Sequence, residues 1–251
     1  MDLGLKDRVY IVTGATRGLG NATARALAAD GAKVLVSGRD EKGVSAAAEE
    51  LGPGAAGVVA DNADPAAARR LVDAAKQRWG RLDGILISVG GPAPGFVADT
   101  TDEQWQSAFD TVFLGAVRLA RTAAAELGEG GVIGFVLSGS VHEPIAGLTI
   151  SNGLRPGLAG FAKSLADELG PRGIRVVGVL PSRIDTDRVR ELDALSGDAE
   201  ASRTANEAQI PLRRYGTPEE FGKTSAFLLS PAASYLTGIM VPVDGGARHG
   251  F

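Results

Sequence analysis

The sequence predicts an α/β fold, in which one Rossmann-type domain carries a doubly wound parallel sheet of about seven strands with helices on both faces. Apolar, β-rich segments alternate with helical patterns along the 251 residues. This alternation is typical of parallel strands joined by crossover helices. A glycine-rich turn also follows the first apolar segment and opens a helix. Because no repeat or linker divides the chain, we expect residues 1–251 to form a single Rossmann-type domain.

The expected strands are short apolar segments bounded by glycine, charged residues or turns. Their continuous apolar character fits strands that are buried on both faces of a sheet. They are Arg8–Thr13, Lys33–Ser37, Gly57–Ala60, Gly84–Ser88, Gly131–Ser138, Ile174–Leu180 and Ile239–Val243.

Several of the helices between these strands have recognisable starts. Asp64-Pro65 predicts a helix with aspartate as its N-cap and proline in the first helical position. The helical pattern over Ser151–Leu169 carries an apolar stripe, and a second long helix is expected over Asp102–Glu126. Two capping boxes are predicted from their spacing, Thr101 with Gln104 and Thr217 with Glu220.

Two connections are too long for simple turns. Val89–Thr100 contains a run of glycine and proline that excludes regular structure. Pro181–Pro211 contains polar helical segments. Long connections in compact domains are usually functional, so residues 183–210 are expected to form a lid insertion over the substrate.

The composition excludes several classes of function. The net charge of -4 gives no basic footprint for nucleic acid. There is no cysteine, and with only two histidines a metal site is not expected. No segment resembles a signal sequence or a membrane span. We therefore expect a cytoplasmic protein with no nucleic-acid or membrane partner.

The glycine-rich turn is the strongest functional signal. It reads Thr13-Gly14-Ala15-Thr16-Arg17-Gly18-Leu19-Gly20. Glycines at these positions let the backbone approach a pyrophosphate, and the N-terminus of the following helix offers free N–H donors. We expect Gly14, Thr16, Arg17, Gly18, Leu19 and Gly20 to bind a dinucleotide.

The spacing T-G-x-x-x-G-x-G resembles that of the short-chain dehydrogenase/reductase family. The likeness extends over nearly the whole chain, through Asp61-Asn62, Pro181–Thr186 and the closing segment from Leu236 to Gly246. The pattern is similar to a divergent branch that resembles the 3-oxoacyl-carrier-protein reductases. This resemblance implies a carbonyl/alcohol oxidoreductase and adds five residues to the expected cofactor site: Asp61, Asn62, Gly90, Pro181 and Ile184.

The end of the second strand indicates which cofactor is bound. An acidic residue there would bind the ribose hydroxyls of NAD, but the strand ends Val36-Ser37-Gly38-Arg39. Asp40 is interpreted as a helix N-cap. Arg39 and Arg17 together suit a 2′-phosphate, because guanidinium groups form charge-assisted hydrogen bonds with phosphate. The predicted cofactor is therefore NADP(H).

The catalytic positions depart from the family pattern of a serine followed by Tyr-x-x-x-Lys. The alignment that the resemblance implies places Ser151 at the tyrosine and Arg155 at the lysine. The strand-end serine is Ser138 or Ser140, since spacing favours the first and local pattern the second. The family's helix asparagine is replaced by Val112. We take Ser138, Ser140, Ser151 and Arg155 as the catalytic candidates, with Arg155 also in the cofactor site.

Three functional hypotheses remain open. In the leading one, a strand-end serine and Arg155 polarise a ketone or 3-oxoacyl carbonyl for reduction by NADPH, while water or His142 supplies the proton. The favoured interpretation of His142 is nevertheless that of an ordinary loop residue. The alternative is a catalytically impaired NADP(H) sensor or scaffold, because Ser151, Arg155 and Val112 have all changed. A lyase or isomerase on the same fold is the third.

The resemblance also implies partners. The expected ligand besides NADP(H) is a small-molecule carbonyl or alcohol. The family likeness implies a homotetramer or homodimer, with the helices Asp102–Glu126 and Ser151–Leu169 against their symmetry mates.

Overall fold

A computed structural model describes residues 2–250 and contains the predicted doubly wound sheet. Seven strands are hydrogen-bonded in the order β3-β2-β1-β4-β5-β6-β7, and every neighbouring pair is parallel. Each strand overlaps one of the predicted segments, and β3 begins two residues earlier than predicted. The strands are β1 (Val9–Val12), β2 (Lys33–Gly38), β3 (Ala55–Val59), β4 (Gly84–Ile87), β5 (Val132–Val136), β6 (Arg175–Pro181) and β7 (Ile239–Val243).

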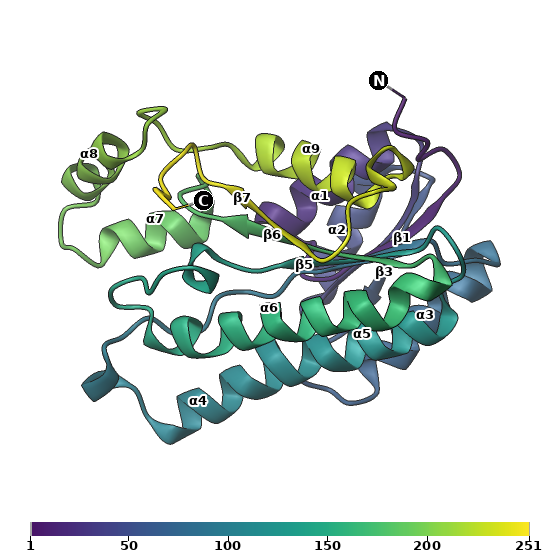
Figure 1. Ribbon diagram of the computed structural model, residues 1–251, viewed down its shortest axis with the longest axis horizontal. Coiled ribbons are helices and arrows are strands. Elements are labelled where there is room, and N and C mark those ends of the chain that lie inside the picture. Colours follow the sequence, from purple (N-terminus) through teal and green to yellow (C-terminus); the bar gives the residue numbers. More distant parts are fainter. Residues whose placement is uncertain (1, 251) are drawn as a thin grey trace.

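Helices cover both faces of the sheet (Figure 1). One layer packs on one apolar core and consists of α1 (Gly18–Ala29), α2 (Glu41–Leu51) and α9 (Pro218–Leu229). The opposite layer consists of α3 (Ala67–Trp79), α5 (Gly115–Glu126) and α6 (Thr149–Leu169). The apolar stripe predicted on α6 is buried in this second core. The fold prediction is therefore confirmed: a single Rossmann-type domain.

The order of the strands creates a crevice at their carboxyl ends. The chain moves outward from β1 to β2 and β3, and then crosses back to β4 on the other side of β1. At this switch point Thr13 Oγ1 donates to Ser88 O at 2.8 Å and accepts from Ser88 N–H at 2.9 Å. Ligands of open α/β sheets bind at such a switch point, so the fold itself places the candidate site here.

Two helices differ from the prediction. The helix after β3 does not begin at Pro65. Asp64 instead accepts from the N–H of Ala66, which forms a turn, and α3 begins at Ala67. The helix expected over Asp102–Glu126 is α4 (Asp102–Ala108) followed by α5, with the π-helical segment η2 (Phe109–Leu114) between them. Both predicted capping boxes are present, at the starts of α4 and α9.

The remaining elements lie mainly in the connections. The long segment after β6 contains α7 (Asp187–Ala194) and α8 (Ala199–Gln209), as its polar helical pattern predicts. These helices lie beside the end of β7, near the C-terminal end of the chain (Figure 1). The short 3-10 helices are η1 (Val97–Asp99), η3 (Gly139–Val141), η4 (Gly170–Arg172) and η5 (Pro231–Ala233). None of the helices within residues 2–250 combines the length and apolarity needed to cross a bilayer.

Candidate active site

The glycine-rich turn forms a cradle whose backbone positions accommodate only glycine. A Cβ at Gly14 would lie 2.6 Å from Ser88 O, and one at Gly20 would lie 2.5 Å from Gly14 O. Gly14 and Gly18 also have φ values of +57° and +59°, which L side chains rarely adopt. Helix α1 starts at Gly18 without a side-chain cap, so its first N–H groups are free to meet an anion. This geometry fits a pyrophosphate.

Of the two arginines predicted to bind a 2′-phosphate, Arg17 belongs to this turn and Arg39 lies beside it. A Cβ at Gly38, the last residue of β2, would lie 2.6 Å from Thr16 Cγ2, so the end of β2 packs directly on the turn. Arg39 follows it and is exposed. The Arg17 side chain is 75% exposed and has one weak ion pair, at 3.7 Å. Asp40 accepts from the N–H of Gly43 and caps α2, which confirms its predicted role as an N-cap.

The other predicted cofactor residues lie at the same edge of the sheet. Asp61 follows β3, and its Oδ1 accepts from the N–H of Ala63 at 3.0 Å. The carbonyl of Asn62 packs on α5, where a Cβ at Gly115 would lie 2.4 Å away. Gly90 follows β4 and is exposed.

The residues after β6 reach the same edge. Pro181 ends β6. Ile184, which is 3% exposed, forms an isolated parallel bridge with Gly216. Two residues later Thr186 approaches the glycine-rich turn, where a Cβ at Gly18 would lie 3.8 Å from its Cγ2.

Of the two strand-end serines, the structure pairs Ser140 with Ser151. Their Oγ atoms lie 3.2 Å apart, and the residues are 3% and 6% exposed. Ser138 makes a different hydrogen bond. Its Oγ accepts from the N–H of Ser140 at 3.1 Å and caps η3. Two hydroxyls are thus joined at the carboxyl edge of the sheet.

Arg155 lies one helical turn after Ser151 and is buried, with 4% of its surface exposed. Its Nη1 donates to Val136 O at 2.7 Å, and its Nη2 makes a long contact of 3.5 Å with Val89 O. Its Nε is buried and has no hydrogen-bond partner in the described chain. No carboxylate within residues 2–250 pairs with it. Burial lowers the pKa of Arg155 to about 10 because the charged form is desolvated.

The surroundings of Val112, the predicted counterpart of the family's helix asparagine, are apolar. Val112 lies in the π-helical segment, is 1% exposed, and packs with Ile150 and Leu154 at the start of α6. An asparagine there could hydrogen-bond to neighbouring groups, and valine cannot.

The three tyrosines lie away from the serine pair along the chain and in their contacts. The Tyr10 hydroxyl donates to Leu229 O at 3.2 Å, and burial raises the pKa of Tyr10 to about 12. Tyr215 donates to Asp193 at 3.0 Å. Tyr235 is fully exposed.

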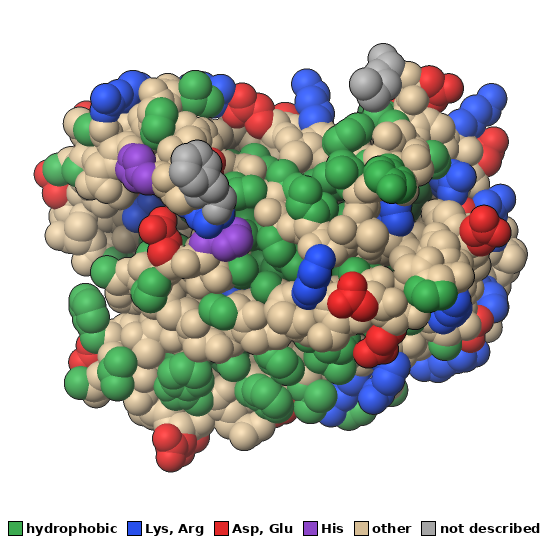
Figure 2. All heavy atoms as spheres, in the orientation of Figure 1, with side chains coloured by type: hydrophobic (Ala, Val, Ile, Leu, Met, Phe, Trp, Pro, Cys, Tyr) green, Lys and Arg blue, Asp and Glu red, His purple; other side chains and the backbone are tan. Residues whose placement is uncertain are grey.

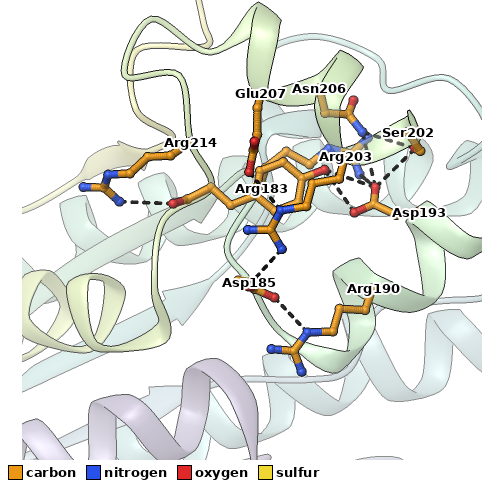
Figure 3. Close-up of polar contacts among 10 residues, drawn as sticks. Arg183, Asp185, Arg190, Asp193, Ser202, Arg203, Asn206, Glu207 and Arg214 are labelled. Atoms are coloured by element: carbon orange, nitrogen blue, oxygen red, sulfur yellow. Dashed lines mark hydrogen bonds and ion pairs between the residues drawn. The ribbon is translucent and has the colours of Figure 1, made fainter. Parts of the chain in front are cut away.

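Asp193 organises the segment between β6 and α9, and sequence reasoning missed it (Figure 3). It is 4% exposed and accepts from the hydroxyl of Tyr215 and from Nη1 of Arg183, the latter at 3.1 Å. From α8, Asn206 donates to it at 3.2 Å and Ser202 lies 3.5 Å away. A buried carboxylate with this many donors joins α7, α8 and the residues on either side into one unit.

A second carboxylate, Asp185, lies between two arginines of the same segment (Figure 3). It accepts from Nε of Arg190 at 2.8 Å and from Nη1 of Arg203 at 3.1 Å. Arg203 also donates to Glu207 at 2.9 Å. The pKa of Asp185 is lowered, since the hydrogen bonds and charges of Arg203 and Arg190 outweigh the opposing effect of desolvation.

Helix α7 reaches both sides of the crevice. Asp187 lies 3.7 Å from Arg17 of the glycine-rich turn. The next residue, Arg188, donates from Nη2 to Pro92 O at 2.8 Å, in the segment after β4. The pair with Arg17 is solvent-exposed and therefore weak.

Within residues 2–250, no group of three or more histidine and acidic side chains is arranged to hold a metal ion.

Comparison with known proteins places the chain in a family. A family model described as "Enoyl-(Acyl carrier protein) reductase" matches residues 14–248. The chain belongs to the short-chain dehydrogenase/reductase family. The monensin polyketide synthase putative ketoacyl reductase of Streptomyces virginiae is 37% identical over 252 residues, covering 95% of this chain and 96% of that protein. The 3-oxoacyl-[acyl-carrier-protein] reductase FabG of Escherichia coli K12 is 32% identical over 253 residues, covering 97% and 98%.

Solved structures agree with this assignment. L-sorbose reductase from Gluconobacter frateurii, complexed with NADPH and L-sorbose, superimposes with a TM-score of 0.94 at 27% identity, covering 100% of both chains. A short-chain dehydrogenase/reductase from Brucella melitensis gives 0.93 at 28% identity, also covering 100% of both chains. The predicted family, and its branch similar to the 3-oxoacyl-carrier-protein reductases, are confirmed. The chain is therefore an oxidoreductase-family protein whose relatives include ketoacyl reductases.

Proposed function

We propose that this protein is an NADPH-dependent oxidoreductase that reduces a ketone or a 3-oxoacyl-type carbonyl. The observation that carries the proposal is that the cradle of Gly14, Gly18 and Gly20 and the Ser140–Ser151 pair share one edge of the sheet. The NADPH complex of L-sorbose reductase and the ketoacyl reductase relatives support the cofactor and the reaction class. When bound, NADPH supplies the hydride.

The chain's own residues would hold the cofactor along the crevice. The free N–H groups at the start of α1 meet the pyrophosphate. Arg17 and Arg39 grip the 2′-phosphate, and Arg17 gives up its weak pair with Asp187 to do so. Asp61 and Asn62 contact the adenine. Gly90, Pro181 and Ile184 line the cleft farther along, toward the nicotinamide.

The serine pair and Arg155 would replace the family's tyrosine and lysine. Ser140 and Ser151 donate hydrogen bonds to the carbonyl oxygen as negative charge develops on it, which is worth most in a site shielded from water. Neither hydroxyl is acidic enough to act as a phenol does, because the phenol pKa is about 10 and an alkanol holds its proton more tightly. Arg155 turns its unpaired Nε–H toward a ribose hydroxyl and releases its long contact with Val89 O.

We also propose that residues 183–210 are the lid. The network around Asp193 and Asp185 makes α7 and α8 a preformed unit. The contacts of Asp187 and Arg188 connect that unit to both sides of the crevice. The lid would therefore move as one body, since its internal hydrogen bonds outnumber those at its edge.

The alternative function is a catalytically impaired NADP(H) sensor or scaffold. It is favoured by one observation, the engagement of Arg155 with the backbone carbonyls of Val136 and Val89 rather than with an open cleft. In this alternative, Arg155 stabilises the ends of two strands. The protein then binds the cofactor at the glycine-rich turn without reducing a substrate.

We propose in addition a homodimeric or homotetrameric assembly in the cytoplasm. Hydrophobic side chains gather over the lower face of the molecule, along α4 to α6 (Figure 2). Phe109 is 40% exposed there and stacks on Phe113, with ring centroids 5.3 Å apart. Gly157 of α6 lies against the same cluster, where its Cβ would be 3.1 Å from Phe113. A second copy of the chain would cover this apolar face.

The experiment that separates the two functions is a turnover screen. Purified protein is mixed with NADPH and a panel of ketones and 3-oxoacyl thioesters, and cofactor oxidation is followed by absorbance. We expect oxidation that depends on one substrate class. Because no residue has a phenol's chemistry here, the double variant Ser151→Tyr with Arg155→Lys should raise turnover of a generic ketone. Binding of NADPH without turnover in either form would support the sensor.

A further inference from the structure

A hollow opens at the carboxyl edge of the sheet, between the segment after η3 and the residues after β7. Gly139 and Ile145 form part of its wall. Gly139 precedes Ser140 in the chain. Ile145 exchanges two backbone hydrogen bonds, at 3.0 and 2.9 Å, with the side chain of Asn152, the residue after Ser151. Two residues of the wall therefore connect to the serine pair: Gly139 precedes Ser140 in the chain, and Ile145 is hydrogen-bonded to the residue that follows Ser151.

Beside apolar neighbours, this hollow is lined by four charged or titratable side chains. They are His142, Glu143, Asp244 and Arg248. Asp244 is engaged in the local turn, because its carboxylate accepts from the N–H of Gly246 at 2.9 Å and from the N–H of Arg248 at 3.1 Å. In Figure 2, histidine, arginine and acidic side chains lie close together near the C-terminal end of the chain.

Carbonyl reduction needs a proton as well as a hydride, and the serine pair cannot supply it efficiently. Arginine retains its proton near neutral pH. Glutamic acid side chains ordinarily lose their proton well below neutral pH and are poor proton donors in this range. His142 is the lining side chain whose ordinary pKa allows it to give and regain a proton in this range. It is exposed, so it can recover its proton from water.

We propose that His142 is the general acid of this active site and performs the proton transfer for which the family uses a tyrosine. The inference rests on the proposed reductase function. Its place is set by η3, whose turn carries both Ser140 and the backbone N–H of His142, which donates to Gly139 O at 3.0 Å. The substrate carbonyl lies between the serine pair and the hollow, with its oxygen toward His142.

Bound NADPH would supply the hydride that forms the new C–H bond at the carbonyl carbon, and the C=O π electron pair would move to the oxygen. Ser140 and Ser151 stabilise that oxygen by hydrogen bonds. The imidazolium of His142 breaks one N–H bond and gives its proton to the oxygen, which completes the alcohol. His142 leaves the step neutral and takes a proton from water.

The surroundings of His142 determine the direction of its pH dependence. Its pKa is lowered, first by desolvation and then by the charge of Arg248, while Glu143 opposes the shift. Asp244 is the other charged group of the lining. At neutral pH the imidazolium form of His142 is therefore less populated than that of an ordinary histidine. It becomes the main form only when the pH falls below the ordinary pKa of histidine. Reduction should accelerate toward acidic pH, and oxidation of the alcohol should be favoured at neutral and higher pH.

The experiment uses the full-length protein and the variant His142→Gln. Its matched control is His249→Gln, which makes the same change at the other histidine, outside the lining of the hollow. For each protein, kcat and KM for the best ketone are measured against pH, NADPH affinity is measured by calorimetry, and folding is checked by thermal unfolding. General acid catalysis contributes about 100- to 10,000-fold.

We expect His142→Gln to lose at least about 100-fold in kcat and its acid-side increase in rate, with NADPH affinity unchanged. Added imidazole should restore part of the rate in His142→Ala. The His249→Gln control should keep the wild-type profile. An unchanged kcat and pH profile in His142→Gln would overturn this inference and leave the reductase function standing. Absence of turnover in the wild-type protein would overturn both.

Discussion

Replacing Arg155 by methionine separates the two roles open to this buried arginine. Methionine is apolar and unbranched, and it fills much of the same space. The charged form of Arg155 is destabilised by burial, which lowers its pKa from the ordinary value of arginine to about 10. At about 1.4 kcal/mol per pKa unit, that fall corresponds to a cost of about 3 kcal/mol near neutral pH.

The sign of this cost follows from the two pKa values. The folded state holds the Arg155 proton less tightly than the unfolded state, so charge on Arg155 opposes folding at every pH below about 10. The penalty fades only as the pH rises from there toward the ordinary pKa of arginine. Across the neutral range both states are protonated. The difference in unfolding free energy between wild type and Arg155→Met should therefore be independent of pH there.

The hydrogen bond to Val136 O works in the opposite direction. A hydrogen bond to a charged group stabilises by about 1.5–3 kcal/mol, which offsets most of the burial cost. We therefore expect Arg155→Met to change the free energy of unfolding by no more than about 1–2 kcal/mol. If Arg155 binds the cofactor, NADPH affinity should fall by about 10- to 100-fold, the equivalent of one lost charged hydrogen bond.

The assay is urea unfolding with and without NADPH, together with calorimetric titration. Arg175→Met is the matched control, because Arg175 is also buried and donates to the carbonyls of Leu228, Ser230 and Leu236 at 2.8, 2.9 and 3.2 Å, at the amino end of β6. It should lose more stability and keep its affinity for NADPH. The reasoning would be refuted if Arg155→Met lost several kcal/mol of stability and bound NADPH as tightly as the wild type.

Four further results are expected. Arg39→Asp should reverse or abolish a preference for NADPH over NADH in calorimetric titrations, and equal affinities in the wild type would contradict the 2′-phosphate site. Asp193→Asn should lower the free energy of unfolding by about 3–5 kcal/mol, as for a broken buried ion pair, and an unchanged urea midpoint would argue against that network. Hydrogen exchange over residues 183–210 should slow when NADPH binds, whereas exchange already slow without NADPH would oppose a mobile lid. Light scattering should report a dimer or tetramer, and a monomer at micromolar concentration would exclude the assembly.

The strands could be predicted because burial on both faces leaves a simple signal. β1, β4 and β5 are buried along their whole length, and a continuous apolar segment marks such a strand without any knowledge of its neighbours. The glycine cradle could be predicted for a similar reason. Gly14 and Gly20 face backbone oxygens at distances that exclude any side chain. The turn therefore requires glycine at these positions, and the glycines are visible in the sequence.

The choice between Ser138 and Ser140 could not be made from the sequence. The chain leaves the strand at Val136 and turns into η3 at Gly139. Two serines separated by one residue then point to different partners, one to a backbone N–H and the other to Ser151. Which serine meets Ser151 depends on where the strand stops and the turn of η3 begins.

Asp193 and Pro65 show two other limits. Asp193 lies in a polar helix without an apolar stripe, where an acidic residue is expected to face water. Its burial comes from Arg183, Tyr215 and α8, which are brought together only by the fold. At Pro65, a turn formed by Asp64 precedes the helix, and proline fits such a turn as readily as a first helical position.

We propose that this chain transfers hydride to a carbonyl, with Ser151 and Arg155 at the positions that the family likeness assigns to tyrosine and lysine. The most direct test is a reaction with NADPH deuterated at the nicotinamide C4, using the best substrate from the ketone and thioester panel, followed by mass spectrometry of the product. The proposed function predicts an alcohol that carries deuterium on the former carbonyl carbon. Tight binding of NADPH with no deuterium in any product would contradict it and identify the protein as a cofactor sensor.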